Sequence, residues 1–403
     1  MIRPPPINSA FLQHLLDLAQ ASFGVRNPPP RALAAAVRQV SERYTRRRQE
    51  VALTAGDPGA LAARLRFFLP RDLFKVWGPL DELAAVGALP TATTPKVLDL
   101  GAGLGTTTLG LSSFTAAAGS AQGLVVHAVD RDRQALSVMK RLLAPPAGPP
   151  GLSCAPVTLT TYTNLLEPAH WSESLPDGPY DIIVLGLCLN ELLATIPDVP
   201  RRVAEGEALL RRLSESLSDD GVMIVIEPAL REQARTLAAI RDRLVGGRAP
   251  PHVFAPCVGC PTCPMLARQR DWCHEDIPWE LPAALAEIAG AAGLRRAGLT
   301  YSYLTLHARP RSLAELAVVP AHARRVVSAP LPSKGKLELE LCGPEGGTRM
   351  MALNRDRRRD PDVLSDLGRG TVLALAPDDI DDSKRGARAR LLPGRSPRVL
   401  RRP

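Results

Sequence analysis

The segment VLDLGAGLG, from position 97 to position 105, constrains the fold of this chain more than any other stretch. A short apolar run ends at Leu100, glycine then occurs at every second position, and residues 106–114 have the composition of a helix. Glycines let the backbone approach a ligand closely, and the first N–H groups of a helix attract an anion. The dinucleotide fingerprint needs glycine at position 106, where this chain has Thr106. The segment therefore predicts a strand–loop–helix turn that binds another nucleotide-type ligand, with an ordinary tight turn as the alternative.

Apolar strands and amphipathic helices alternate downstream of this turn. The predicted strands are residues 97–100, 124–129, 180–187, 221–226 and 299–306. The predicted helices are residues 106–114, 133–143, 204–217, 231–245 and 281–292. Because these strands are almost wholly apolar, they fit a parallel sheet that helices cover on both faces. The predicted fold class is therefore α/β, with a Rossmann-like sheet.

Breaks in this pattern divide the 403 residues into several predicted units, as expected for a chain longer than one average domain. In chain order they are a helical N-terminal domain at 1–90, the α/β domain at 91–310 with a Cys- and Pro-rich insertion at 250–279, a β-rich module at 311–382 and a basic tail at 383–403. In the β-rich module, residues 336–341 and 348–354 are predicted to pair across a Gly-Pro-Glu-Gly-Gly turn. The sequence identifies no chemistry in the helical domain.

The positive charge of the chain is concentrated at its C-terminal end. The net charge is +9, and residues 383–403 hold eight Lys and Arg side chains and no acid, so the rest of the chain is close to neutral. Such a tail often contacts nucleic acid or another polyanion, and a solvated end is the alternative.

The sequence also predicts the compartment of the protein. No stretch approaches the ~20 apolar residues of a membrane-spanning helix, and the first residues lack the pattern of a secretion signal. A cytoplasmic protein with no membrane partner is therefore expected. Thiols stay reduced in that compartment, so the seven cysteines indicate metal or redox chemistry rather than disulfides.

Four of the seven cysteines lie together in the Cys- and Pro-rich insertion. Cys257, Cys260 and Cys263 form a C-x2-C-x2-C pattern, and Cys273 and His274 follow. Thiolates at this spacing converge on one centre, and the pattern is close to that of ferredoxins, which bind [4Fe–4S] clusters. Zinc held by four of these five side chains is the alternative, and a set of unligated cysteines is the third interpretation.

An acid two residues before the first glycine, followed by glycines at alternate positions, is similar to the pattern of class I S-adenosylmethionine-dependent methyltransferases. That resemblance implies S-adenosylmethionine as the cofactor, with its methionine portion beside the glycine loop and its ribose hydroxyls donating to Asp130. The cofactor-binding residues that it implies are Asp99, Gly101, Gly103, Gly105, Asp130 and Asn190.

The segment after Leu187 would face the donor methyl group in such a fold. Amino methyltransferases often carry an Asn/Asp-Pro-Pro-aromatic motif there, and this chain has Asn190 without the prolines or the aromatic residue. Cys188 is a candidate nucleophile for methylation of a pyrimidine carbon, although a buried strand cysteine is far more common. The sequence identifies no catalytic base, so the catalytic residues stay unassigned.

Three further motifs follow the glycine motif in order. They are the strand at 180–187 that runs into Asn190, the strand end Ile-Glu-Pro at 226–228 and the segment Val-Phe-Ala-Pro-Cys at 253–257. In combination, these motifs resemble the methyltransferase-like family of ribosomal small-subunit assembly factors, which is known in mitochondria and has bacterial members. The resemblance extends from Pro70 to Thr371.

The family resemblance implies a [4Fe–4S] cluster held by Cys257, Cys263, Cys273 and Cys342. Cys260 lies where the family pattern needs no cysteine, and it is kept as an alternative ligand. A ligand at Cys342 would tie the β-rich module to the α/β domain.

The resemblance further implies a factor that associates with the small ribosomal subunit. Arginines at 355–359 and in the basic tail would contact its rRNA by neutralising phosphates. Two alternatives stay open: an active rRNA methyltransferase, and a zinc-stabilised methyltransferase that acts on a substrate other than RNA. The expected oligomeric state is a monomer.

Overall fold

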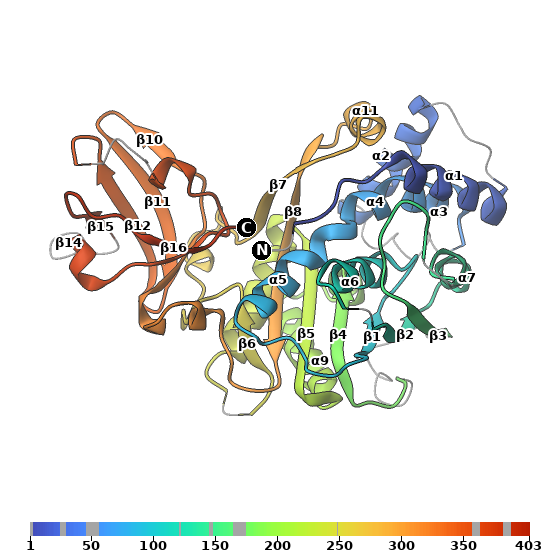
Figure 1. Ribbon diagram of the computed structural model, residues 1–403, viewed down its shortest axis with the longest axis horizontal. Coiled ribbons are helices and arrows are strands. Elements are labelled where there is room, and N and C mark those ends of the chain that lie inside the picture. The colour runs from blue at the N-terminus through green and yellow to red at the C-terminus, as the bar shows by residue number, and fades with distance from the viewer. Residues whose placement is uncertain are drawn as a thin grey trace.

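The computed structural model describes residues 3–24, 30–45, 56–120, 122–144, 148–163, 175–247, 249–356, 363–381 and 388–403. Within these ranges the chain forms two eight-stranded sheets. The second sheet and the N-terminal helices lie at opposite ends of the molecule, with the first sheet between them (Figure 1). No helix in the described ranges is long and apolar enough to cross a membrane.

The first sheet has the strand order β3-β2-β1-β4-β5-β8-β6, and β7 pairs with β8. Its strands are β1 (Lys96–Leu100), β2 (Leu124–Asp130), β3 (Val157–Thr163), β4 (Tyr180–Gly186), β5 (Leu217–Pro228), β6 (His252–Ala255), β7 (Glu275–Glu280) and β8 (Ala297–His307). The strands β1 to β5 are parallel, and β8 runs antiparallel to β5. The strand order reverses between β1 and β4, which is where open α/β sheets bind their ligands.

The expectation of a wholly parallel sheet is wrong for β8. The chain reaches this strand through β7 and α11 (Ala283–Ala291), and α11 packs on the N-terminal helices instead of on a face of the sheet (Figure 1). Parallel neighbours need a crossover over the sheet, and without one the chain enters β8 in the opposite direction. The sequence analysis also missed β3, which alternates with threonines, and β7, which contains a proline and acids.

The N-terminal helices are built onto the first sheet. They are α1 (Ser9–Phe23), α2 (Pro30–Thr45) and a continuous run of α3 (Pro58–Ala63), the π-helical turn η2 (Arg64–Phe68), α4 (Leu69–Asp72), the 3-10 turn η3 (Leu73–Val76) and α5 (Trp77–Ala85). Apolar residues of α1 and α5 share a core with the sheet, and those of α2 and α3 share a core with α11. The run widens at η2, where the Leu69 N–H donates to the Arg64 carbonyl. Pro70, which follows, has no N–H to donate, and such a gap in the ladder favours a wider turn.

Other helices cover both faces of the first sheet. On one face, α6 (Thr106–Ala117) and α7 (Arg133–Leu142) pack with α5 against β1 and β2. On the other face, α9 (Val199–Ser214) and α10 (Arg231–Leu244) pack against β4 and β5. The short helix α8 (Leu189–Leu192) follows β4 directly. The sheet therefore lies between two apolar cores, as its apolar strands predict.

The second sheet has the strand order β14-β15-β12-β11-β9-β13-β16, and β10 pairs with β11. Its strands are β9 (Ala323–Val326), β10 (Leu331–Ser333), β11 (Lys336–Gly343), β12 (Gly346–Leu353), β13 (Val372–Ala374), β14 (Ile380–Asp381), β15 (Arg388–Leu391) and β16 (Arg398–Arg401). Short 3-10 turns occur at η5 (Pro264–Leu266), η6 (Leu313–Leu316), η7 (Pro320–His322), η8 (Val363–Asp366) and η9 (Pro377–Asp379). The β11–β12 hairpin closes at Gly343 and Gly346, within the turn that the sequence predicts.

The basic C-terminal segment is part of this sheet, so a free tail is the wrong description of residues 388–403. Arg390 forms an ion pair with Asp356, and Arg401 is buried. The apolar residues Ala389 and Leu391 between the arginines are also buried, because alternate side chains of a strand point to opposite faces. The first basic residues of the segment and the arginines at 357–359 lie outside the described residues.

A buried ionic cluster joins the second sheet to α5 and to the first sheet. Arg325 of β9 donates to Glu82 and Glu275, over 2.8 and 2.9 Å. Arg401 of β16 donates to Asp81 over 2.9 Å and to Glu82 over 3.3 Å. All five side chains are less than one-tenth exposed. Since an unpaired buried charge is costly, the last strand of the chain is needed to neutralise the carboxylates of α5.

Candidate functional site

The glycine loop lies between the carboxyl end of β1 and the start of α6. Gly101, Gly103 and Gly105 all have positive φ angles, which glycine adopts without strain. Asp130, at the end of β2, accepts the Gly103 N–H at one carboxylate oxygen and the Asp132 N–H at the other, each over 2.8 Å. These two hydrogen bonds fix Asp130 against the loop.

Two of the predicted cofactor-binding residues lie behind the loop. Asp99 is fully buried, and its Oδ2 accepts the Thr108 hydroxyl over 2.6 Å. Its Oδ1 has no hydrogen-bond partner, and burial raises the pKa of this carboxyl to about 7. A Cβ at Gly105 would lie 2.6 Å from Met139 Cγ, so this glycine allows α7 to pack closely. Neither residue lines the adjoining cavity.

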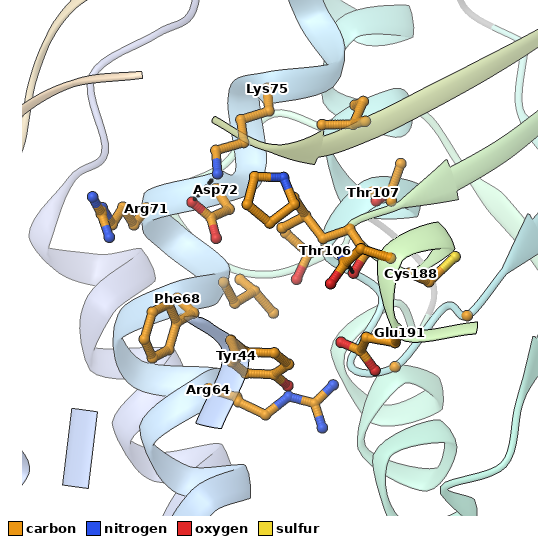
Figure 2. Close-up of a pocket in the computed structure, with 18 of the residues that line it drawn as sticks. Tyr44, Arg64, Phe68, Arg71, Asp72, Lys75, Thr106, Thr107, Cys188 and Glu191 are labelled. Atoms are coloured by element: carbon orange, nitrogen blue, oxygen red, sulfur yellow. Dashed lines mark hydrogen bonds and ion pairs between the residues drawn. The ribbon is translucent and has the colours of Figure 1, made fainter. Parts of the chain in front are cut away.

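A cavity of about 650 Å³ opens above the loop, within the range of cofactor sites (Figure 2). Gly101, Gly103, Asp130 and Asn190 line it, so the structure brings four of the six predicted cofactor-binding residues to one site. The continuous N-terminal run and α2 supply the opposite wall, with Tyr44, Arg64, Phe68, Arg71, Asp72 and Lys75. Trp272 and His274 of the Cys-rich insertion also line the cavity.

Two carboxyl groups lie close to the segment that follows β4: Glu191, which is half-buried and lines the cavity, and Glu227 of β5, which is buried. Leu187 has a φ of 63°, a strained conformation for a branched side chain that is typical of functional sites. Burial raises the pKa of Glu191, which lines the cavity, to about 7. Burial also raises the pKa of Glu227, at the end of β5, to about 8, and its carboxylate accepts the Asn190 N–H over 3.3 Å. The sequence analysis did not single out either glutamate for a role.

Cys188 does not have the environment of a nucleophile. Its side chain is buried, and its thiol donates to the Leu100 carbonyl over 3.0 Å. Burial raises the pKa of this thiol well above its usual value, and a nucleophilic cysteine needs the opposite shift. A Cβ at Gly101 would lie 2.5 Å from Cys188 Cβ, so the side chain is packed beneath the loop. The geometry favours a buried structural cysteine over a nucleophile, although Cys188 lies just after β4 and not within a strand.

Arg64 is the cavity residue that the sequence analysis missed most clearly. It lies in the π-helical turn, and its Nη1 is 4.0 Å from Asp132 Oδ2. Burial acts to lower the pKa of its guanidinium, and the neighbouring Tyr44, Asp130 and Glu191 raise it above the usual value overall. The sequence around Arg64 gives one local signal, an arginine-rich turn before Pro70. That signal does not indicate which residues the Arg64 side chain contacts.

The predicted metal ligands lie in the Cys-rich insertion and in β11, and electrostatic interactions link several of their thiols. Burial and the neighbouring Cys257 raise the pKa of Cys273 to about 12, and Cys257 and Cys273 act in the same direction on Cys263. Cys342 shares a side-chain hydrogen bond with Cys260. Among the described residues, no three His, Cys, Asp or Glu side chains lie close enough to hold a single metal ion. The choice of ligands therefore stays a prediction.

One helix, α10, organises the Cys-rich insertion. The Arg235 guanidinium donates to the carbonyls of Met265, Leu266, Arg268 and Asp271. Arg241 donates to the Cys260 carbonyl, and the Asp242 carboxylate accepts the Cys263 N–H over 3.0 Å. The cysteine loop is thus held by side chains of a regular helix, although it has little regular structure itself.

The chain is similar to one protein family and, distantly, to several solved structures. A model of the family described as mitochondrial small ribosomal subunit Rsm22 matches residues 75–360. No curated protein matches the sequence. A candidate class I S-adenosylmethionine-dependent methyltransferase from Listeria monocytogenes has 12% identity and a TM-score of 0.37, over 74% of this chain and 87% of that chain.

A second solved structure is magnesium protoporphyrin IX methyltransferase from Synechocystis PCC 6803, with 13% identity and a TM-score of 0.31, over 70% of this chain and 99% of that chain. These likenesses are distant, and the assignment of the fold rests on the strand order. Five parallel strands with a reversal between β1 and β4, and an antiparallel β8 inserted before β6, form a class I methyltransferase-like fold.

Proposed function

Because this chain belongs to the Rsm22 family of small ribosomal subunit proteins, we propose that it associates with the small ribosomal subunit and binds S-adenosylmethionine above the glycine loop. The observation that carries the cofactor proposal is the cavity at the carboxyl ends of β1 and β4. Gly101 and Gly103 leave the backbone open there, and Asp130 is fixed beside them with lone pairs left for ribose hydroxyls.

The experiment for the cofactor proposal is calorimetric titration of the full chain with S-adenosylhomocysteine. Asp130→Ala is expected to weaken binding by at least about tenfold, because it removes the ribose acceptor and the brace on Gly103. Asp220→Ala, which removes a carboxylate paired with Arg309 far from the cavity, is the matched control and should bind like the unchanged chain. Equal affinities for all three proteins would contradict the proposed position of the ligand.

We also propose that Cys257, Cys263, Cys273 and Cys342 hold a [4Fe–4S] cluster, with Cys260 as the alternative ligand. The support is the chemistry of the donors: the buried thiol of Cys342 interacts electrostatically with Cys257 and Cys273, which lie far from it in sequence and are partly exposed. When bound, such a group would link β11 to the Cys-rich insertion. Zinc stays the alternative metal.

Metal analysis of anaerobically purified protein tests this proposal. About four irons per chain are expected, as a [4Fe–4S] cluster requires. Cys342→Ser should lose iron, whereas Cys260→Ser should keep it. Stoichiometric zinc without iron would contradict the cluster, and loss of iron in Cys260→Ser alone would reverse the choice of ligands.

A second candidate function is methylation of rRNA. One observation favours it: the cavity continues from the glycine loop to the aromatic rings of Tyr44, Phe68 and Trp272, which leaves room for an acceptor base beside the donor. Transfer of labelled methyl groups to immature small subunits tests it, with Asp130→Ala as the inactive control. Labelled rRNA would establish that the protein is an rRNA methyltransferase. Binding of the donor without methyl transfer would favour an assembly factor that has no methyltransferase activity. Labelling of a protein or small molecule alone would favour the non-RNA alternative.

Contact with rRNA and a cytoplasmic location stay proposals. The exposed arginines of the second sheet support the first, and seven free cysteines fit a reducing compartment. The family description names mitochondria for the family, and fractionation of the source cells decides the location of this chain.

A further inference from the structure

Arg64 reaches across the cavity toward the loop that the glycines leave open. A Cβ at Gly103 would lie 2.7 Å from Arg64 Nη2 and 3.9 Å from Asp130 Oδ2. The guanidinium therefore occupies the space directly above the second glycine of the motif. Figure 2 shows Arg64 and Glu191 approaching each other from the two walls of the cavity.

The backbone around Arg64 is built to place it there. Residues 64–68 form a π-helical turn within a run that is otherwise mostly α-helical, and π turns occur frequently at functional sites. The side chain of Arg64 is about one-fifth exposed, so the cation is held mostly out of water. Its ion-pair partner is Asp132, whose Oδ2 is 4.0 Å from Arg64 Nη1, while both oxygens of Asp130 accept backbone N–H groups. The surrounding acidic groups keep the guanidinium charged.

The opposite wall presents the complementary charge. Glu191 follows β4, lines the cavity and is half-buried, and Arg64 is among the groups that stabilise its charged form. Arg64 and Glu191 thus present opposite charges from facing walls at the end of the glycine loop, and Arg131, which also lines the cavity, likewise stabilises the charged form of Glu191. An amino-acid zwitterion carries the matching pair of charges, a carboxylate and an ammonium group.

We propose that Arg64 and Glu191 bind the amino-acid end of the donor, Arg64 through its α-carboxylate and Glu191 through its α-ammonium group. This inference rests on the proposed binding of S-adenosylmethionine. A guanidinium pairs with a carboxylate through two parallel hydrogen bonds, which fixes orientation as well as position. The N-terminal helices are then part of the cofactor site instead of a separate domain, and a chain that lacks them cannot bind the α-carboxylate in this way.

Calorimetric titrations with three ligands test the assignment. S-adenosylhomocysteine carries both charged groups, decarboxylated S-adenosylhomocysteine keeps only the ammonium group, and 5′-methylthioadenosine has neither. Arg64→Gln should weaken S-adenosylhomocysteine about ten- to a hundredfold and leave the other two ligands unchanged. Glu191→Gln should weaken both ligands that carry the ammonium group and leave 5′-methylthioadenosine unchanged.

The matched control is Arg43→Gln, which removes an ion pair with Asp57 elsewhere in the N-terminal helices. It should leave the affinity for all three ligands unchanged. If Arg64→Gln weakens the binding of all three ligands equally, Arg64 has a general packing role and the assignment is overturned. If it tightens the binding of all three, the Arg64 side chain blocks the cavity, and the assignment is also overturned. If the unchanged chain binds none of the ligands, the proposed cofactor itself fails, which is a separate outcome.

Discussion

At the scale of residues, the sequence predicts which positions of the loop need glycine. It does not predict which residues from distant parts of the chain lie beside the loop. Gly101 and Gly103 have positive φ angles beside the cavity, and the motif places glycine at both positions because this requirement belongs to the loop itself. Asp99 and Gly105 belong to the same motif, yet they lie behind the loop, and Gly105 makes room for Met139. Which side of a loop faces the cavity depends on what packs behind it, and spacing alone does not contain that information.

The same limit applies to the opposite wall of the cavity. Arg64 lies 39 positions before Gly103 in the chain, and no periodic pattern joins them. Its placement depends on the π-helical turn and on the packing of the whole helical run against α6. The chemistry of the N-terminal helices therefore becomes visible only when the fold brings them to the loop.

Glu227 gives a pH-dependent prediction. Burial raises the pKa of this carboxyl to about 8 in the folded chain, whereas an unfolded chain has a value of about 4. The folded state then holds the proton more tightly, so stability falls as the pH rises from about 4 to about 8 and changes no further above that. Glu227→Gln should remove this contribution, so that its melting temperature rises relative to the unchanged chain by about 1–3 °C between pH 5 and pH 8.5.

Thermal unfolding followed by circular dichroism measures this difference. Glu215→Gln alters an exposed glutamate and serves as the control, with no change in the pH profile. A constant difference between Glu227→Gln and the unchanged chain across the pH range would show that this proton is not held more tightly in the folded state.

At the scale of elements, regular helices position irregular segments. The apolar strands β1, β2, β4 and β5 could be predicted because burial on both faces leaves a composition signal. The position of the Cys-rich insertion could not, because it is set by hydrogen bonds from α10 to scattered carbonyls. Arg235 alone donates to four carbonyls of the insertion.

Arg235→Leu should therefore loosen the insertion without altering any cysteine. We expect the variant to lose at least about half of its iron during anaerobic gel filtration, because an unanchored loop exposes the cluster ligands to exchange. Arg231→Leu, an exposed arginine on the same helix, is the control and should retain iron. Equal iron retention in both variants would show that the hydrogen bonds from Arg235 of α10 are not needed to position the cysteines.

At the scale of the whole molecule, the chain end is part of the core. Arg401 belongs to β16 and is paired with Asp81 and Glu82 of α5. Deletion of residues 383–403 would therefore remove two strands and expose this cluster, so it does not isolate the effect of surface charge. The basic composition of the segment favours a polyanion partner, but it is the alternating apolar residues between the arginines that place the segment in the sheet.

Arg401→Gln is expected to destabilise the protein by about 3 kcal/mol, because the buried carboxylates of Asp81 and Glu82 each lose a charged hydrogen-bond donor, although Glu82 keeps Arg325. The midpoint of urea unfolding, followed by tryptophan fluorescence, measures the change. Arg402→Gln alters the next residue, which is exposed, and should shift stability by no more than about 0.5 kcal/mol. Equal midpoints for the two variants would mean that the cluster does not hold the modules together.

The rRNA contact is tested with exposed arginines of the second sheet. The triple variant Arg388→Gln, Arg398→Gln and Arg402→Gln keeps the buried pairs and removes three surface charges. Filter binding to small-subunit rRNA should weaken, and the salt dependence should fall by about 0.7–0.9 in logarithmic slope for each phosphate that the variant no longer neutralises. The same change at Arg201, Arg212 and Arg231, on α9 and α10, controls for net charge. Identical losses in both triple variants would exclude a specific contact at the second sheet.

Co-sedimentation of the full chain with immature small ribosomal subunits tests the central proposal most directly. At 100 mM salt, in the presence of S-adenosylhomocysteine, the protein is predicted to migrate with the small-subunit fraction and not with large subunits. A protein that stays at the top of the gradient with both subunits under these conditions would contradict its assignment as a small-subunit factor.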